Sequence, residues 1–257
     1  ILALPIEDSK GETIGVYQAI NKMAGNREFS EKDLEHLLLA ASYTGKQLEA
    51  LALQEEIEST QREIILTLAE TGEMRSKETG NHVKRVAEYS RILAEAYGLN
   101  PEQINLLKNA SPMHDIGKIA IPDSILLKPS SLSDDERTEM QSHTTLGYEM
   151  LKHSDRALLK TASLIAIQHH EKWDGTGYPR GLKGKEIHIF GRLTAIADVF
   201  DALICKRVYK EPWPVDKIIA MFVEESGKDF DPEVVDAFLK VKHEMVDVSV
   251  RLDDTIS

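Results

Sequence analysis

Short alternating runs of hydrophobic and polar residues open the chain. Residues 1–21, ILALPIEDSKGETIGVYQAIN, predict two β-strands around the polar turn SKGE, because a half-buried strand alternates its apolar side chains. The pattern changes at Ser30, a favourable N-cap residue, after which leucines recur at helical spacing as far as Leu51. A long helix is therefore expected to begin at this serine.

The stretch that follows is charged and favours a helix. Residues 54–70, QEEIESTQREIILTLAE, carry only a thin apolar stripe among Glu and Gln residues. We predict a nearly continuous helix over Ala41–Ala69 that connects two domains and pairs with a second copy in a homodimer. Beyond it the pattern is helical, with breaks at Gly and Pro. The predicted fold class is α+β overall: an all-α bundle preceded by a partial α/β domain and a long connecting helix.

Composition and charge narrow the possible partners. The 257 residues are 42% hydrophobic and 29% charged, as in an ordinary globular protein. A formal net charge of -12 argues against binding a nucleic-acid polymer or an anionic membrane, so local cations or metals must meet any anionic substrate. A single cysteine, Cys205, excludes an internal disulfide framework and fits a reducing cytoplasm.

Two features bear on membranes and on the length of the natural protein. No apolar run approaches the roughly 20 residues that span a bilayer, and no basic and apolar leader opens the chain. The chain begins at Ile1 instead of methionine, so we expect it to be part of a longer protein.

Histidines and carboxylates are the candidate chemistry. Neutral imidazole and carboxylate suit Mn, Fe and Zn, and the adjacent His114 and Asp115 allow a carboxylate to bridge two ions. Glu78 and His82 stand four residues apart, which places them on one helix face. Each residue alone has a structural explanation, but one polynuclear centre explains the whole set. The expected ligands are Glu78, His82, His114, Asp115, His143, His169, His170 and Asp198.

A glycine-rich loop follows the histidine pair. Residues 169–181 read HHEKWDGTGYPRG, and glycines at 175, 177 and 181 permit φ values closed to other residues. We expect this loop to lie over the metal site and to be held by hydrogen bonds of Asp174 and Tyr178. The alternative is a turn with a structural role only. The remaining histidines, His36, His153, His188 and His243, are interpreted as structural.

These motifs together resemble the HD-GYP family of phosphodiesterases, a branch of the HD phosphohydrolase superfamily. The resemblance runs from about residue 71 to 241 and rests on His82, HDIGK at 114–118, His143, HHEKWDGTGYPRGLKG at 169–184 and ADVFDAL at 197–203. It implies an all-α fold with metals between helices and a cyclic dinucleotide substrate, chiefly cyclic di-GMP, linearised to pGpG and in some members cleaved to GMP.

The resemblance also implies roles for single residues. Two cations would share a water and direct it at phosphorus, with Asp115 bridging them and Lys118 orienting the hydroxide or a phosphate oxygen. A glutamate at position 78 implies a third metal, and the resemblance favours iron, with manganese the alternative. Gly177, Tyr178 and Pro179 are associated with substrate or partner contact. Arg207 and Lys210 would hold phosphate or guanine, unless they form a solvated basic face, and Asp201 would bond to a ligand or to Arg207.

The N-terminal residues resemble the last strands and closing helix of a GAF domain, in the pattern LPI...G..IGV.QAINK...F...DL..L. An unrelated α/β fragment is the alternative. The predicted organisation is a partial GAF sensor over 1–47 with an unknown small-molecule ligand, a helical connector over 48–70 and an HD-GYP catalytic domain over 71–257. Three alternatives stay open: hydrolysis of another nucleotide, hydrolysis of another cyclic dinucleotide, and a silent domain that binds nucleotide or a diguanylate cyclase.

Overall fold

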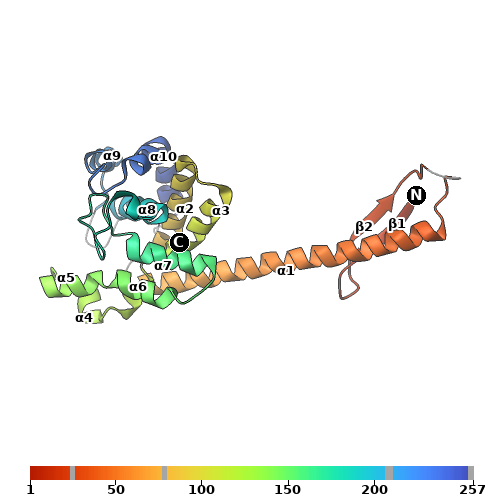
Figure 1. Cartoon of the computed structure of the whole chain (residues 1–257), viewed down its shortest axis with the longest axis horizontal. Helices are drawn as coiled ribbons and strands as arrows, with labels where there is room; N and C mark the ends of the chain where they lie inside the picture. Colours follow the sequence, from red (N-terminus) through yellow and green to blue (C-terminus); the bar gives the residue numbers. More distant parts are fainter. Residues whose placement is uncertain (24–26, 77–79, 206–210, 254–257) are drawn as a thin grey trace. The chain divides into compact units, whose positions relative to one another are not determined.

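The computed structural model describes residues 1–23, 27–76, 80–205 and 211–253 (Figure 1). It divides into two compact units, Ile1–Glu63 and Ile64–Ser257. One helix, α1 (Glu31–Arg75), supplies residues to both units and confirms the helix predicted over Ala41–Ala69. None of the helices within the described ranges is long and apolar enough to cross a membrane.

The N-terminal unit is a β-hairpin packed on the first part of α1. Strands β1 (Leu2–Glu7) and β2 (Thr13–Ala19) pair antiparallel with Leu2 opposite Ala19, which confirms the two predicted strands. The hairpin approaches α1 at Gly45, where an added Cβ would lie 2.1 Å from the Glu7 carbonyl oxygen. Glycine is required there because any side chain would collide with the strand backbone.

The C-terminal unit contains no named strand among its described residues, which confirms the predicted change to helices. The alternation of helical apolar stripes with Gly and Pro produces short helices separated by tight turns. The elements are α2 (Gly80–Tyr97), α3 (Pro101–Ala110), η1 (Ser111–Met113), η2 (Ile116–Ala120), α4 (Asp123–Leu126), α5 (Asp134–Gln141), α6 (His143–Leu151), α7 (Ala157–Gln168), η3 (Gly184–Glu186), α8 (Ile189–Ile204), α9 (Val215–Glu224) and α10 (Pro232–Arg251).

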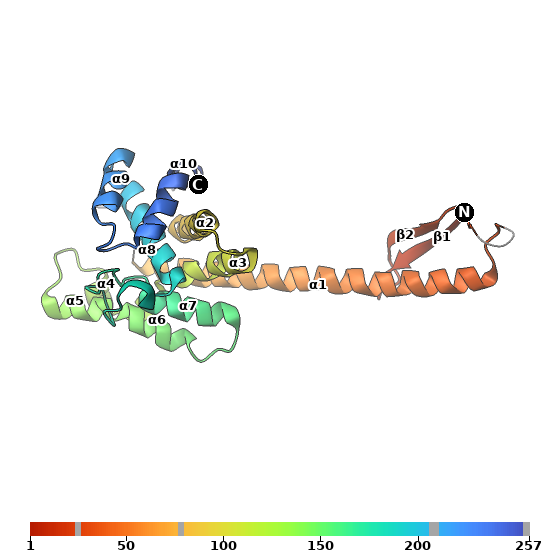
Figure 2. The same ribbon diagram turned by 45° about the horizontal axis from the view of Figure 1, so that its top comes forward.

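Helix α2 is central to the core of this unit. It packs against α3, α8 and α10, and these four helices lie side by side in both ribbon views (Figures 1 and 2). Tyr89 of α2 meets Phe200 of α8 edge to face at 5.1 Å between ring centroids, and Phe238 of α10 completes the aromatic group. All three rings are at most 1% exposed. This packing sets α2 and α8 at a fixed separation.

A second layer holds the turn that contains His114 and Asp115. Helices α6 and α7 pack together, and η2 packs on α6. The contact is backbone against backbone, because a Cβ on Gly117 would lie 1.9 Å from the His143 carbonyl oxygen and 2.5 Å from the Gly147 nitrogen. Gly117 therefore permits the close approach that places Asp115 beside the first residue of α6.

Candidate metal centre

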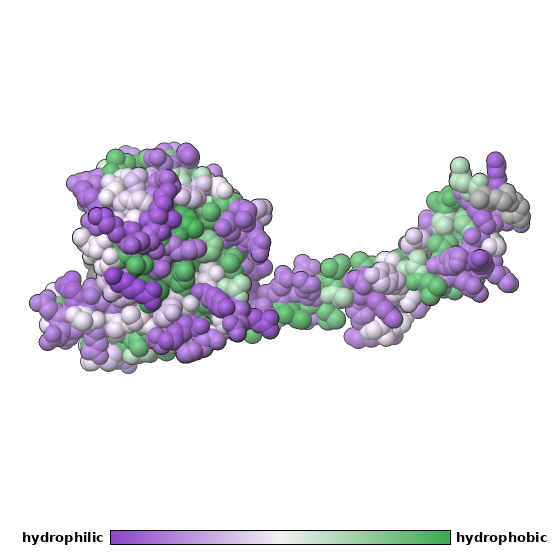
Figure 3. All heavy atoms as spheres, in the orientation of Figure 1, coloured by the Kyte–Doolittle hydropathy of each residue, from purple (hydrophilic) through white to green (hydrophobic). Residues whose placement is uncertain are grey.

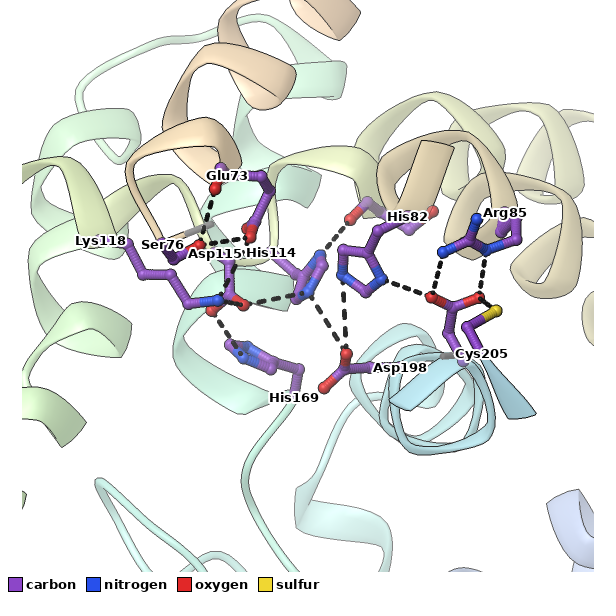
Figure 4. Close-up of polar contacts among 12 residues, drawn as sticks. Glu73, Ser76, His82, Arg85, His114, Asp115, Lys118, His169, Asp198 and Cys205 are labelled. Carbon is purple, nitrogen blue, oxygen red and sulfur yellow. Dashed lines mark hydrogen bonds and ion pairs between the residues drawn. The ribbon is translucent and has the colours of Figure 1, made fainter. Parts of the chain in front are cut away.

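Residues far apart in the sequence bring their ligand atoms to one place in the C-terminal unit (Figure 4). His82 comes from α2, His143 begins α6 and Asp198 lies on α8, while the other four residues lie in the turns that follow η1 and α7. They form two groups in which the ligand atoms lie within 4.8 Å of one another. One group is Asp115, His143, His169 and His170, and the other is His82, His114 and Asp198.

The carboxylate of Asp115 lies between the two groups. Its Oδ1 atom is 3.1 Å from Nε2 of His143, and its Oδ2 atom is 3.3 Å from Nε2 of His114. In the second group, Oδ1 of Asp198 is 3.8 Å from Nε2 of both His82 and His114. A carboxylate that faces both groups with separate oxygens has the geometry of a bridging ligand.

Hydrogen bonds of Nδ1 fix the orientation of the rings. Nδ1 of His114 lies 3.0 Å from the Ser111 carbonyl oxygen, Nδ1 of His143 lies 2.8 Å from that of Met140, and Nδ1 of His169 lies 3.1 Å from that of Ile165. A carbonyl oxygen only accepts, so Nδ1 must donate in all three rings. In its neutral form, such a ring presents the lone pair of Nε2 towards Asp115 and its neighbours, as a metal ligand does.

His82 is oriented by a carboxylate instead of a carbonyl group. Its Nδ1 atom lies 2.8 Å from Oδ2 of Asp201. The Asp201 carboxylate also accepts two hydrogen bonds from the Arg85 guanidinium, at 2.6 Å on Oδ1 and at 3.0 Å on Oδ2. Burial raises the pKa of Asp201, but the bonds from His82 and Arg85 lower it more, so the group is ionised. Asp201 is 1% exposed and bonds to His82, one of the candidate ligands, which is one of the two contacts expected for it from the sequence.

Burial and charge make the centre a site that attracts cations. The pKa of Asp115 lies well below its ordinary value: burial opposes the shift, and the charges of Lys118 and His114 outweigh it. Burial opposes the shift of the His114 pKa, but the charge of Asp115 raises it to about 10, so metal binding at Nε2 of this ring would displace a proton. Burial lowers the pKa of His169 and His170, which keeps those imidazoles neutral. Ionised carboxylates and neutral imidazoles are the donor forms that bind divalent metals.

Lys118 reaches the centre, as predicted, and among the described residues it contacts the carboxylates of Asp115 and Glu73 there. Its ammonium is 2.6 Å from Oδ2 of Asp115 and 3.3 Å from Oε2 of Glu73, a buried residue near the end of α1 (Figure 4). Sequence reasoning missed Glu73, because it lies 45 residues from Lys118 and belongs to no motif that we had singled out.

The loop after His170 is held mainly by a residue that the sequence analysis passed over. Both carboxylate oxygens of buried Glu171 accept backbone N–H groups, from Arg180 at 2.7 Å and from Leu182 at 2.9 Å. The feature of the sequence that could have identified Glu171 is its position directly after the histidine pair. Asp174 accepts hydrogen bonds from Thr176, as expected of a loop residue. Tyr178 donates its backbone N–H to the His170 carbonyl oxygen at 3.2 Å and stacks on the His170 ring with centroids 4.8 Å apart.

The glycines of this loop serve two different purposes. Gly175 and Gly181 have φ values of +89° and +64°, as the sequence predicted. Gly177 has no such φ, and it is required for space: a Cβ there would lie 2.2 Å from the Lys172 nitrogen. The loop backbone therefore packs directly on residues 171–172, which brings Tyr178 and the exposed Pro179 to the edge of the centre.

Three predicted site residues, Glu78, Arg207 and Lys210, lie outside the described residues. Of the histidines interpreted as structural, His188 caps α8 by accepting the backbone N–H of Phe190.

Comparison with known proteins assigns the fold of this unit. A family model described as an HD domain matches residues 66–234. The chain belongs to the HD-domain family. Its match begins at residue 66, so the partial GAF domain assigned to residues 1–47 stays a prediction.

Named relatives of this HD-domain chain come from several bacteria. It is 45% identical to 3'3'-cGAMP-specific phosphodiesterase 2 of Vibrio cholerae, over 89% of this chain and 44% of that protein. It is 43% identical to the cyclic di-GMP phosphodiesterase response regulator RpfG of Xanthomonas campestris pv. campestris, over 74% and 50% of the two chains. A cyclic di-GMP phosphodiesterase of Thermotoga maritima is 44% identical over 75% and 52%. The chain spans about half the length of these curated relatives.

A solved structure has the same fold. The crystal structure of a cyclic GMP-AMP specific phosphodiesterase of Vibrio cholerae, V-cGAP3, superimposes on the HD-domain chain with a TM-score of 0.56. The aligned part covers 74% of this chain and 52% of that one at 18% sequence identity, so the likeness concerns the fold.

Proposed function

We propose that the chain is a metal-dependent phosphodiesterase of the HD-GYP type that hydrolyses cyclic di-GMP to pGpG and, in a second step, to GMP. The observation that carries the proposal is a set of buried imidazole nitrogens directed at one carboxylate. Nε2 of His114, His143 and His169 is buried and makes no well-aligned hydrogen bond among the described residues, although the Asp115 carboxylate lies 3.1–3.5 Å from each. Buried polar atoms without partners are costly, and a bound cation satisfies them.

The donor set fits two divalent metal ions. His143, His169 and His170 would hold one ion and His82, His114 and Asp198 the other, with Asp115 contributing to both. When bound, such ions lower the pKa of a water toward neutrality and neutralise phosphate oxygens. Iron is the proposed metal and manganese the alternative, since both accept His and carboxylate ligands. A third ion held by Glu78 remains part of the proposal.

The chain's own groups supply the remaining chemistry. The Lys118 ammonium lies beside Asp115, where it is placed to hold a phosphate oxygen by a charge-assisted hydrogen bond. Tyr178, stacked on His170, offers a ring and a hydroxyl at the edge of the centre, and Gly177 and Pro179 shape that edge. Arg207 and Lys210 are proposed to grip the second phosphate or a guanine.

The names of the relatives divide between two substrates, which gives a second candidate function. Proteins named cyclic di-GMP phosphodiesterase include those of Xanthomonas campestris and Thermotoga maritima, whereas the 45% identical protein of Vibrio cholerae is named 3'3'-cGAMP-specific. Both substrates are cyclic dinucleotides joined by two phosphodiesters and differ in one base. The metal centre suits either one, so base contacts must decide.

The proposed partners include a second copy of this chain. Along α1, exposed hydrophobic side chains recur at heptad spacing, and green atoms are visible along this helix in Figure 3. The stripe consists of Leu39, Tyr43, Leu53, Ile57 and Ile64, each more than half exposed. The same proposal includes the domain organisation: a partial GAF sensor over 1–47 with a small-molecule ligand, the connector over 48–70 and the catalytic domain over 71–257. It also includes a diguanylate cyclase as a partner.

Metal analysis beside a hydrolysis assay tests the proposal. Anaerobically purified protein is expected to hold two to three Fe or Mn ions and to hydrolyse cyclic di-GMP faster than 3'3'-cGAMP when both are assayed separately. Asp115→Ala should abolish hydrolysis and lower metal content, because it removes the carboxylate shared by both groups. His243→Ala, an exposed histidine on α10, is the control and should change neither. Hydrolysis of both substrates by metal-free protein would refute the proposal, and faster hydrolysis of 3'3'-cGAMP would favour the second candidate.

A further inference from the structure

The last turn of α1 places a buried carboxylate beside the lysine of the HDIGK turn. We propose that Glu73 positions the Lys118 ammonium at the centre once Asp115 is engaged with metal, an inference that rests on the proposed phosphodiesterase function. Glu73 is 2% exposed, and its Oε2 atom accepts from the Ser76 hydroxyl at 3.1 Å and from the Lys118 ammonium at 3.3 Å (Figure 4). Glu73 is thus a positioning residue, which acts through Lys118.

Among the described residues, Asp115 and Glu73 are anionic neighbours of Lys118, and of these two Asp115 belongs to the metal-ligand set. Asp115 is the nearer one, with Oδ2 2.6 Å from the ammonium, but the same carboxylate faces the imidazole nitrogens of His114 and His143. Cations bound to Asp115 would neutralise the negative charge that attracts the Lys118 ammonium, and they would also repel that ammonium. Glu73 belongs to neither group of candidate ligands among the described residues, although its charge also acts on His114, so it can hold the ammonium while Asp115 is engaged.

The position of Glu73 is fixed by the neighbouring arginine on the same helical turn. The Arg75 guanidinium donates to the backbone carbonyl groups of Lys118, Ile119 and Ile121, the last at 3.1 Å, and forms an ion pair with Asp123 at 2.6 Å. These contacts tie the end of α1 to the backbone of η2 and to the residues that follow it. Glu73 and Lys118 are therefore held in register by several bonds besides their own.

The reactivity of the Lys118 amine tests the assignment without relying on turnover. Wild-type protein and Glu73→Gln would be treated with an N-hydroxysuccinimide acetate ester, with and without Mn²⁺, and acetylation of Lys118 followed by peptide mass spectrometry. In metal-loaded protein, Glu73→Gln should acetylate about fivefold faster, the factor that corresponds to loss of one hydrogen bond. In metal-free protein Asp115 still holds the amine, so the two rates should agree.

A matched control separates this effect from a general change in charge. Glu70 lies one turn earlier on α1 and pairs with Lys84 at 3.0 Å, so Glu70→Gln removes the same charge from the same helix. We expect it to leave Lys118 reactivity unchanged in both states. Equal acetylation rates in metal-loaded Glu73→Gln and wild-type protein would overturn the proposal, as would an equal acceleration in Glu70→Gln.

A kinetic double-mutant cycle provides the second readout. Glu73→Gln should lower kcat for cyclic di-GMP about tenfold at unchanged metal content, as expected for a weakened charge-assisted hydrogen bond. In a Lys118→Ala background the same change should have almost no further effect, because Glu73 acts through the lysine. Additive losses, or a loss of metal content in Glu73→Gln, would assign Glu73 a separate structural role and reject the proposal. Failure of wild-type protein to cleave cyclic dinucleotides would reject the proposed function, while the acetylation result would still report on Glu73.

Discussion

Replacement of Asp201 by asparagine tests how the chain prepares His82 to bind metal. The carboxylate accepts from Nδ1 of His82 at 2.8 Å and from Arg85 at 2.6 Å and 3.0 Å, in a place that is 1% exposed. Asparagine keeps the shape but removes the charge and offers one accepting oxygen instead of two. The side-chain amide of asparagine can also donate an N–H to Nδ1 of His82. Nδ1 would then be the acceptor, and the ring proton would lie on Nε2, the atom that is needed to bind metal.

Two separate magnitudes follow from these contacts. Breaking a buried ion pair costs about 3–5 kcal/mol, and since asparagine retains one acceptor we expect a loss of about 3 kcal/mol in unfolding free energy. For a unit of this size that lowers Tm by about 6–12 °C. Loss of the correct His82 tautomer should weaken metal binding about 10- to 100-fold, the usual effect of removing the hydrogen-bond partner of a ligand histidine.

The assay must separate stability from metal affinity. Thermal unfolding of metal-free protein measures the first, and competition for Mn²⁺ against a chromophoric chelator measures the second. A double variant, Asp201→Leu with Arg85→Met, replaces the ion pair by apolar groups and should recover most of the stability without recovering the affinity. Asp236→Asn, an exposed aspartate on α10, serves as the control. Metal affinity equal to wild type in Asp201→Asn would refute the tautomer argument and leave Asp201 a structural residue.

Two further variants test the loop and the connector. Gly177→Ala adds a Cβ that would lie 2.2 Å from the Lys172 nitrogen, so the rate of hydrolysis should fall at least about tenfold while metal content is retained. Gly72→Ala, whose Cβ would make ordinary contacts, is the control. Full activity in Gly177→Ala would contradict the packing argument. Ile57→Asp places a charge in the exposed stripe of α1 and should give a monomer by light scattering. Ser59→Asp, which lies off the stripe, is the control and should leave the dimer intact. A monomeric wild-type protein at micromolar concentration would reject the dimer.

Local sequence patterns determined much of this protein's architecture. The alternation in residues 1–21 predicted the hairpin, and the leucine spacing after Ser30 predicted the long helix, because both signals depend on neighbours a few residues apart. The ordered motifs likewise indicated which side chains would meet at the centre. His82, His114, Asp115, His143, His169, His170 and Asp198 all contribute to the two groups that the structure contains.

Tertiary structure decided how those side chains are held. The contacts of Glu73 with Lys118 and of Arg85 with Asp201 join residues 45 and 116 positions apart, and no local pattern encodes such pairs. Gly177 appeared to need an unusual φ, and only the packing against residues 171–172 revealed a need for space. Asp201 shares its motif with Asp198, yet it lies one turn further along α8, where it is buried beside Arg85 and His82. The residues of a motif can be identified from the sequence. The partner of a buried charged group cannot, because it depends on which helices pack together, and a buried charge without a partner would be costly.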